Sequence, residues 1–178
     1  LKVARERLDP WSNAMALNTL SDFMRTRGNM DEAALAYQQA LELFDTLDFA
    51  PHGLMHNLGY VTLAKDDPRG AAGLFLQAGD AYRTFGSDRR GLAECVIGLA
   101  RTAARTGDLT LAARLFGSAE GTLEQAGTLL TPANRADYGR GLAVLEAAME
   151  PKQLASERAA GRSINVDEAL HQARVLAL

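Results

Sequence analysis

A pattern of one aromatic residue between two small residues occurs three times in this chain, and it constrains the fold more than any other feature. In each copy the aromatic residue follows one small residue by four positions and precedes the other by three. The copies are Ala33, Tyr37 and Ala40; Ala71, Phe75 and Ala78; and Ala112, Phe116 and Ala119. Spacings of three and four place these positions on one face of a helix. Their recurrence predicts a stack of similar helical units.

A turn residue stands five positions before the first alanine of each copy. Eight positions before that turn residue stands an apolar residue, and a small residue follows it directly. The turn residues are Gly28, Asp66 and Gly107, and the pairs are Leu20 with Ser21, Leu58 with Gly59, and Leu99 with Ala100. Each unit is therefore predicted to be two antiparallel helices, with small residues where the backbones approach closely. We expect left-handed glycines at the helix ends, and a capping box from Asn29 to Glu32.

The composition favours helices along the whole chain. There are 32 Ala and 27 Leu residues but only 6 Val and 2 Ile residues, so good helix formers greatly outnumber β-branched residues. The sequence therefore predicts an all-α fold.

Charge, hydropathy and cysteine content argue against several classes of function. The net charge is −3 and like charges do not form long runs, so we expect no direct contact of this segment with nucleic acid. A run of about 18 apolar residues or a signal-peptide core would indicate a membrane partner, and neither is found. Cys95 is the single cysteine, which excludes an internal disulfide and favours a cytoplasmic location.

The chain is predicted to form one domain over residues 1–178. We expect residues 1–10 to be the tail of a preceding repeat, residues 11–48, 51–86 and 88–127 to be three units, and residues 131–178 to be a degenerate unit with a closing cap. Helices are predicted over residues 132–149, 151–161 and 166–176 from the start signals of Pro132, Pro151 and Asn165. Val3, Ala4 and Leu8 could expose an apolar face, so self-association through the N-terminal end is expected.

The three units resemble the tetratricopeptide repeat (TPR). The resemblance covers residues 14–126, and it implies helix pairs that stack as a right-handed superhelix with an inner face for partners. The turn residues are 38 and 41 positions apart, whereas the repeat of this family has about 34 residues. The extra length could lie in longer helices or in loops.

A closer likeness lies in the second half, over residues 91–95, 107–120, 160–162 and 167–169. These segments resemble the C-terminal TPR region of bacterial signalling ATPases and LuxR-type transcriptional regulators. The resemblance implies that this chain is part of a larger regulator whose ATPase and DNA-binding modules lie elsewhere.

Residue types that carry chemistry are present, but their spacing does not favour an enzyme. His52 and His56 lie four apart, yet Gly53 stands where a zincin motif has Glu, so we expect no metal. Cys95 lies in an apolar stretch and is expected to be an inert buried thiol. Neither a phosphate-binding loop nor a dinucleotide fingerprint is complete, and the glycines at 139 and 141 are expected in a loosely packed helix. We therefore expect no catalytic residues and no cofactor.

The candidate binding site is the inner face of the superhelix, which the resemblance assigns to the first helix of each pair. Position by position, the polar and aromatic residues there are Asn18, Asp22, Arg25, His56, Asn57, Tyr60, Arg101 and Arg105. Arg and Tyr are common in binding hot spots, so we expect recognition of a protein or peptide segment, or of other modules of the same regulator. The alternatives are a solvated face without a partner and a sensor domain that binds a small effector inside the superhelix.

Overall fold

The computed structural model describes residues 9–47, 51–85 and 88–178, and within these ranges the chain is all-helical. It forms nine α-helices and a 3₁₀ helix, with no strand among the described residues: α2 (Pro10–Thr26), α3 (Met30–Asp45), α4 (His52–Ala64), α5 (Pro68–Phe85), α6 (Arg89–Thr106), α7 (Leu109–Ala126), α8 (Pro132–Ala148), α9 (Pro151–Arg162), α10 (Val166–Gln172) and η1 (Ala173–Ala177). The all-α prediction is confirmed. Val3, Ala4, Leu8 and most of the predicted tail lie outside the described residues.

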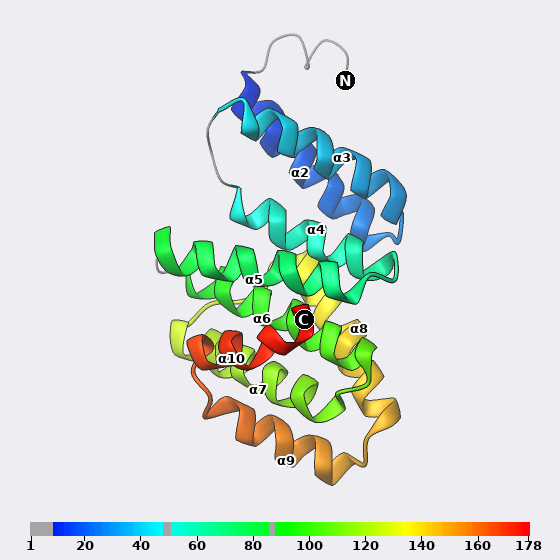
Figure 1. Ribbon diagram of the computed structural model, residues 1–178, viewed down its shortest axis with the longest axis vertical. Helices are drawn as coiled ribbons and strands as arrows, with labels where there is room; N and C mark the ends of the chain where they lie inside the picture. The colour runs from blue at the N-terminus through cyan, green and yellow to red at the C-terminus, as the bar shows by residue number, and fades with distance from the viewer. Residues whose placement is uncertain (1–8, 48–50, 86–87) are drawn as a thin grey trace.

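The first six helices form three pairs that follow one another along the molecule (Figure 1). Within each pair, α2 with α3, α4 with α5, and α6 with α7, a short turn brings the second helix back along the first. Helix α3 also packs on α4, α5 packs on α6, and α7 packs on α9. The long repeat has two sources, because α5, α6 and α7 each have 18 residues and six residues separate α3 from α4.

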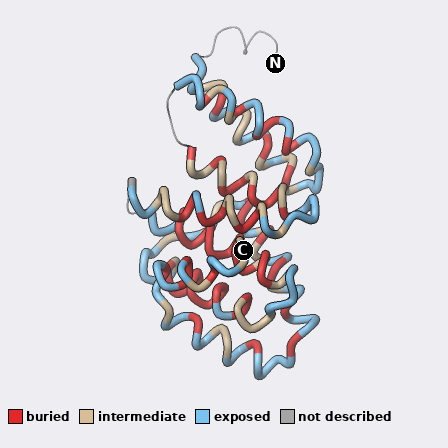
Figure 2. Tube along the Cα trace, in the orientation of Figure 1, coloured by how far each residue is buried: buried red, intermediate tan, exposed pale blue. Residues whose placement is uncertain are grey.

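The residues of the threefold pattern form the contacts between helices. All nine are fully buried, with 0% relative exposure for the three aromatic and the six alanine positions. The small residue Gly59 is needed for close packing, because a Cβ at this position would lie 2.6 Å from Cε1 of Phe75. The predicted use of small and aromatic positions in packing is therefore confirmed (Figure 2).

The turns agree with the sequence in position but not in every hydrogen bond. Gly28 has a φ of 84° and Gly107 a φ of 91°, as expected for left-handed helix ends. Asn29 precedes α3, but its side chain makes no capping hydrogen bond, so the predicted capping box is wrong. At the middle turn Asp66 adopts a φ of 65°, and the Asp67 carboxylate accepts a hydrogen bond from the Gly70 amide at 2.8 Å.

The C-terminal helices begin where the sequence predicts, and α8 takes a separate course. Thr131 caps α8 by accepting a hydrogen bond from the Asn134 amide, and Asn165 caps α10 in the same way. The predicted last helix is divided, because η1 follows α10. Helix α8 runs behind the stacked pairs in Figure 1 and contacts α2, α6 and α7.

Most of the buried apolar residues form one cluster that extends from α4 to η1, and a smaller cluster joins α2, α3 and α4. Exposed residues line the outer helices α2, α3 and α9 in Figure 2. No helix in the described ranges combines the length and the apolar character needed to cross a membrane.

Candidate functional site

The structure brings seven of the eight predicted site residues together on the side of the helix pairs that faces α8. We call this surface, formed by α2, α4 and α6, the inner face. Four of its side chains are buried: Arg25 (0% exposed), His56 (2%), Asn57 (5%) and Tyr60 (2%). Asn18, Asp22 and Arg101 are partly exposed. These four side chains are therefore shielded from solvent in the structure, whereas the other three remain partly accessible.

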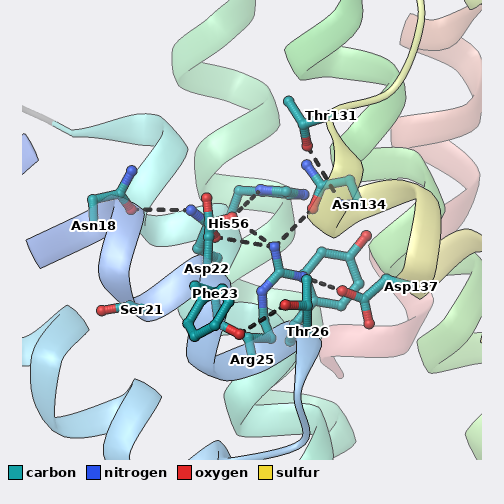
Figure 3. A network of polar contacts seen from close by, with 12 residues as sticks. Asn18, Ser21, Asp22, Phe23, Arg25, Thr26, His56, Thr131, Asn134 and Asp137 are labelled. Carbon is teal, nitrogen blue, oxygen red and sulfur yellow. Dashed lines mark hydrogen bonds and ion pairs between the residues drawn. The ribbon is translucent and has the colours of Figure 1, made fainter. Parts of the chain in front are cut away.

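Arg25 lies at the centre of the network on this face. Its Nη2 donates hydrogen bonds to the side-chain oxygens of Asp22 (3.2 Å), Asn134 (3.0 Å) and Asn57 (3.5 Å). Its Nε donates to the Tyr37 hydroxyl at 3.2 Å, and that hydroxyl donates to Asp22 at 2.6 Å. Figure 3 shows the guanidinium pointing from α2 toward the residues of α8. The side chain is thus fixed from α2, α3, α4 and α8 at once.

Asp137 of α8 is the carboxylate that balances this arginine. Its Oδ2 accepts a hydrogen bond from Nη1 of Arg25, and its Oδ1 accepts from Arg101 and, at 2.7 Å, from Nη2 of Arg140. The Asp137 side chain is only 1% exposed. Burial lowers the pKa of Arg25, but the carboxylates of Asp137 and Asp22 outweigh it and raise that pKa above its usual value. A buried pair of this kind depends on both partners, since loss of either one leaves a buried charge with fewer opposite charges around it.

The start of α8 is anchored by Glu94 of α6. Oε1 of Glu94 accepts a hydrogen bond from the Thr131 amide at 3.2 Å. Burial raises the pKa of Glu94, and hydrogen bonds from Asn134 and Thr131 oppose that rise. Together with Asp137, these contacts hold the first two turns of α8 against α2 and α6.

Gly141 allows α8 to approach α6 one turn further along. A Cβ on Gly141 would lie 2.6 Å from Cζ of Phe116 and 2.7 Å from Cγ of Arg101. The prediction of a loosely packed helix at residues 139–141 is therefore wrong at Gly141, although Gly139 has open space around it.

The aromatic side of the network comes from α4. The guanidinium of Arg25 lies 4.7 Å from the ring centroid of Tyr60, and that of Arg101 lies 5.3 Å from the same centroid. Nδ1 of His56 is 3.1 Å from Oδ1 of Asn57, and Nδ2 of Asn57 donates to Asn18 at 3.1 Å. Burial and the charge of Arg25 lower the pKa of His56 to about 3, so the ring is neutral at pH 7.

Arg105 is the predicted site residue that lies apart from this network. It is exposed, and its Nη2 donates from α6 to Oδ1 of Asp66, at 2.5 Å, in the turn between α4 and α5. Sequence reasoning missed four members of the network, namely Tyr37, Asn134, Asp137 and Arg140. The sequence did contain a signal that α8 faces polar groups, because Asn134 and Asp137 lie three positions apart and so on one face of a predicted helix.

Two side chains that could carry chemistry, Cys95 and His56, are buried. Cys95 is fully buried and burial raises the pKa of its thiol, which disfavours the reactive thiolate. His56 is neutral and enclosed by the rings of Tyr60 and Phe75. Within the described ranges no group of three or more His, Cys, Asp or Glu residues could hold a metal ion.

No protein-family model, no curated protein and no solved structure matches this chain.

Proposed function

We propose that this chain is a non-catalytic interaction module whose inner face recognises a helical protein segment. We further propose that its three helix pairs form a right-handed superhelix of the TPR type, as in the C-terminal region of a bacterial signalling ATPase or transcriptional regulator. The fully buried threefold pattern and the succession of three pairs support this proposal. A single buried cysteine agrees with a reducing, cytoplasmic setting.

The observation that carries the proposal is the seating of α8 on the inner face. Asn134 and Asp137, three positions apart on α8, both receive hydrogen bonds from the buried guanidinium of Arg25. This is the geometry of a helix recognised in a groove, in which a few anchors at spacings of three and four determine the position of the helix. The same side chains that sequence analysis assigned to a partner thus hold a helix of the chain itself.

Helix α8 is, in this proposal, the resident occupant of the face, and a partner presents an equivalent helix with Asn and Asp three positions apart. The partner is a protein or peptide segment or another module of the same regulator. A linked helix competes at an effective concentration in the millimolar range, so an external helix binds well only when α8 is released or weakened.

A synthetic peptide of residues 129–149 tests whether the inner face recognises a helix. The host is the chain with Asn134→Ala and Asp137→Ala, in which the resident helix has lost both anchors. We expect the peptide to bind this host at least tenfold more tightly than the unmodified chain, as measured by fluorescence anisotropy. It should also raise the melting temperature of the host, because it supplies a carboxylate to Arg25.

The matched control is the same peptide with the change Asp137→Ala, which retains length and most of the helical surface. It should bind the host at least tenfold more weakly than the original peptide. Failure of the original peptide to bind, or equal binding of both peptides, would mean that the inner face is internal packing and not a recognition surface.

A further inference from the structure

A pocket of about 340 Å³ opens beside the inner face, between α4, α6 and α8. Arg101 and Arg105 of α6 and Arg140 of α8 line it, together with apolar side chains that include Leu63, Ala104 and Val144. The volume lies at the lower end of the range for small-molecule sites. Neither the internal packing of α8 nor the proposed helix recognition requires an open pocket at this position.

The guanidinium groups at this pocket have more donors than the surrounding carboxylates use. Arg101 and Arg140 each donate one hydrogen bond among the described residues, and both go to the same Asp137 oxygen. Arg105 donates one hydrogen bond, to Asp66. A guanidinium carries five N–H donors in a planar fork, so most donors of the three groups remain for a ligand.

The charges around the pocket leave an excess of positive charge. Arg25, Arg101 and Arg140 surround the single carboxylate of Asp137. Asp22 pairs with Arg25 at 3.2 Å, and Asp66 pairs with Arg105. Four guanidinium groups thus share three carboxylates, and Arg101 is largely shielded, with a side-chain exposure of 21%. An anion that entered the pocket would meet guanidinium groups on α6 and on α8.

The remaining wall suits an organic group. Val144 is 50% exposed, and Leu63 lies deeper, at 7% exposure. Arginine forks recognise carboxylate and phosphate oxygens, while an apolar wall beside them holds a carbon skeleton. We propose that this pocket binds a small organic oxyanion, a phosphate ester or a carboxylate, whose charged group contacts Arg101, Arg105 and Arg140 and whose apolar body lies against Val144. The ligand bridges α6 and α8 and stabilises the seated position of α8.

Phenyl phosphate and benzoate are suitable probes, with inorganic phosphate and phenol as partial ligands. Titrations of the whole chain at constant ionic strength would be followed by isothermal calorimetry and by the amide NMR signals of Arg105 and Gly141. We expect saturable binding of phenyl phosphate or benzoate, weaker binding of inorganic phosphate, and no saturation with phenol. The tighter of the two organic anions identifies the charged group of the ligand class.

Two variants and one matched control separate a built site from general charge attraction. Arg105→Ala combined with Arg140→Ala should weaken binding at least tenfold, and Val144→Glu should do the same without removal of an arginine. Arg114→Ala is the control, because Arg114 is an exposed arginine that pairs with one carboxylate, Glu157, at 2.7 Å on a different surface. It should change affinity less than twofold, and a melting curve of each variant shows whether the fold is retained.

Three results would overturn the proposal. The first is the absence of saturable binding of either organic anion to the unmodified chain. The second is an equal loss of affinity in Arg114→Ala, which would indicate non-specific attraction. The third is unchanged affinity in a folded Val144→Glu variant, which would place the anion away from this pocket.

Discussion

The replacement Asp137→Ala is the most direct perturbation of the inner face, because it leaves a buried positive charge behind. Arg25 has 0% side-chain exposure, and Asp137 has 1%. Loss of one partner of a buried ion pair costs about 3–5 kcal/mol. Asp22 at 3.2 Å and the neutral oxygens of Asn57 and Asn134 still contact Arg25, so we expect a value near the lower limit, about 3 kcal/mol. In a chain of 178 residues this corresponds to a melting temperature lower by about 6–12 °C.

Urea unfolding followed by circular dichroism at 222 nm gives the free energy of unfolding for this comparison. Glu124→Ala is the matched control, because it also removes a carboxylate from an arginine, Arg162, but the two side chains are 46% and 61% exposed. An exposed pair contributes about 0–1 kcal/mol, so the control should unfold near the unmodified chain. A second comparison is Arg25→Met with Asp137→Leu, which removes both charges and should cost less than Asp137→Ala alone. A loss below about 1 kcal/mol in Asp137→Ala would refute the buried network.

The remaining predictions concern pH and helix contacts. The unfolded chain protonates His56 near pH 6.5 and the folded chain only near pH 3, so this residue's contribution to stability is complete above pH 6.5 and is lost as the pH falls. His56→Phe should therefore lose about 2 kcal/mol less stability than the unmodified chain between pH 7 and pH 5 in urea titrations. Gly161→Ala should destabilise the chain by about 1–3 kcal/mol in thermal unfolding, because its Cβ would overlap the Arg114 carbonyl where α9 crosses α7. Gly139 has open space around it, so Gly139→Ala should instead raise the free energy of unfolding by at most about 1 kcal/mol. Equal effects of the two variants would mean that the contact between Gly161 and Arg114 is misassigned.

Local signals in the sequence were sufficient to predict the helices and the residues that the threefold pattern buries between them. Ala71, Phe75 and Ala78 repeat at a spacing that only a helix places on one face, and their full burial follows from that periodicity. Thr131 and Asn165 mark helix starts because their side-chain oxygens satisfy free backbone amides, which depends on a few adjacent residues. Asn29 shows the limit of this reasoning, since it occupies the capping position without the side-chain hydrogen bond.

The candidate site could be predicted only in part, because its residues meet across long separations. Seven of the inner-face positions follow from the repeat, but their partner α8 lies more than a hundred residues from Arg25 in the sequence. Helix α8 does not present a clear apolar stripe, since Asn134, Asp137 and Gly141 occupy its inward positions. Apolar periodicity therefore could not show which way α8 faces, and the ion pairs that orient it are tertiary contacts.

The polar character of this interface explains how one position of α8 is selected. An apolar stripe on both helices would tolerate a shift of α8 by a turn, because dispersion contacts are not directional. Here a shift by one turn would move Asp137 away from Arg25 and leave that buried guanidinium with fewer acceptors. The same shift would bring a side chain in place of Gly141 against Arg101 and Phe116, where a Cβ does not fit. The buried charges thus favour a single register of α8, and an external helix would have to satisfy the same two conditions to replace it.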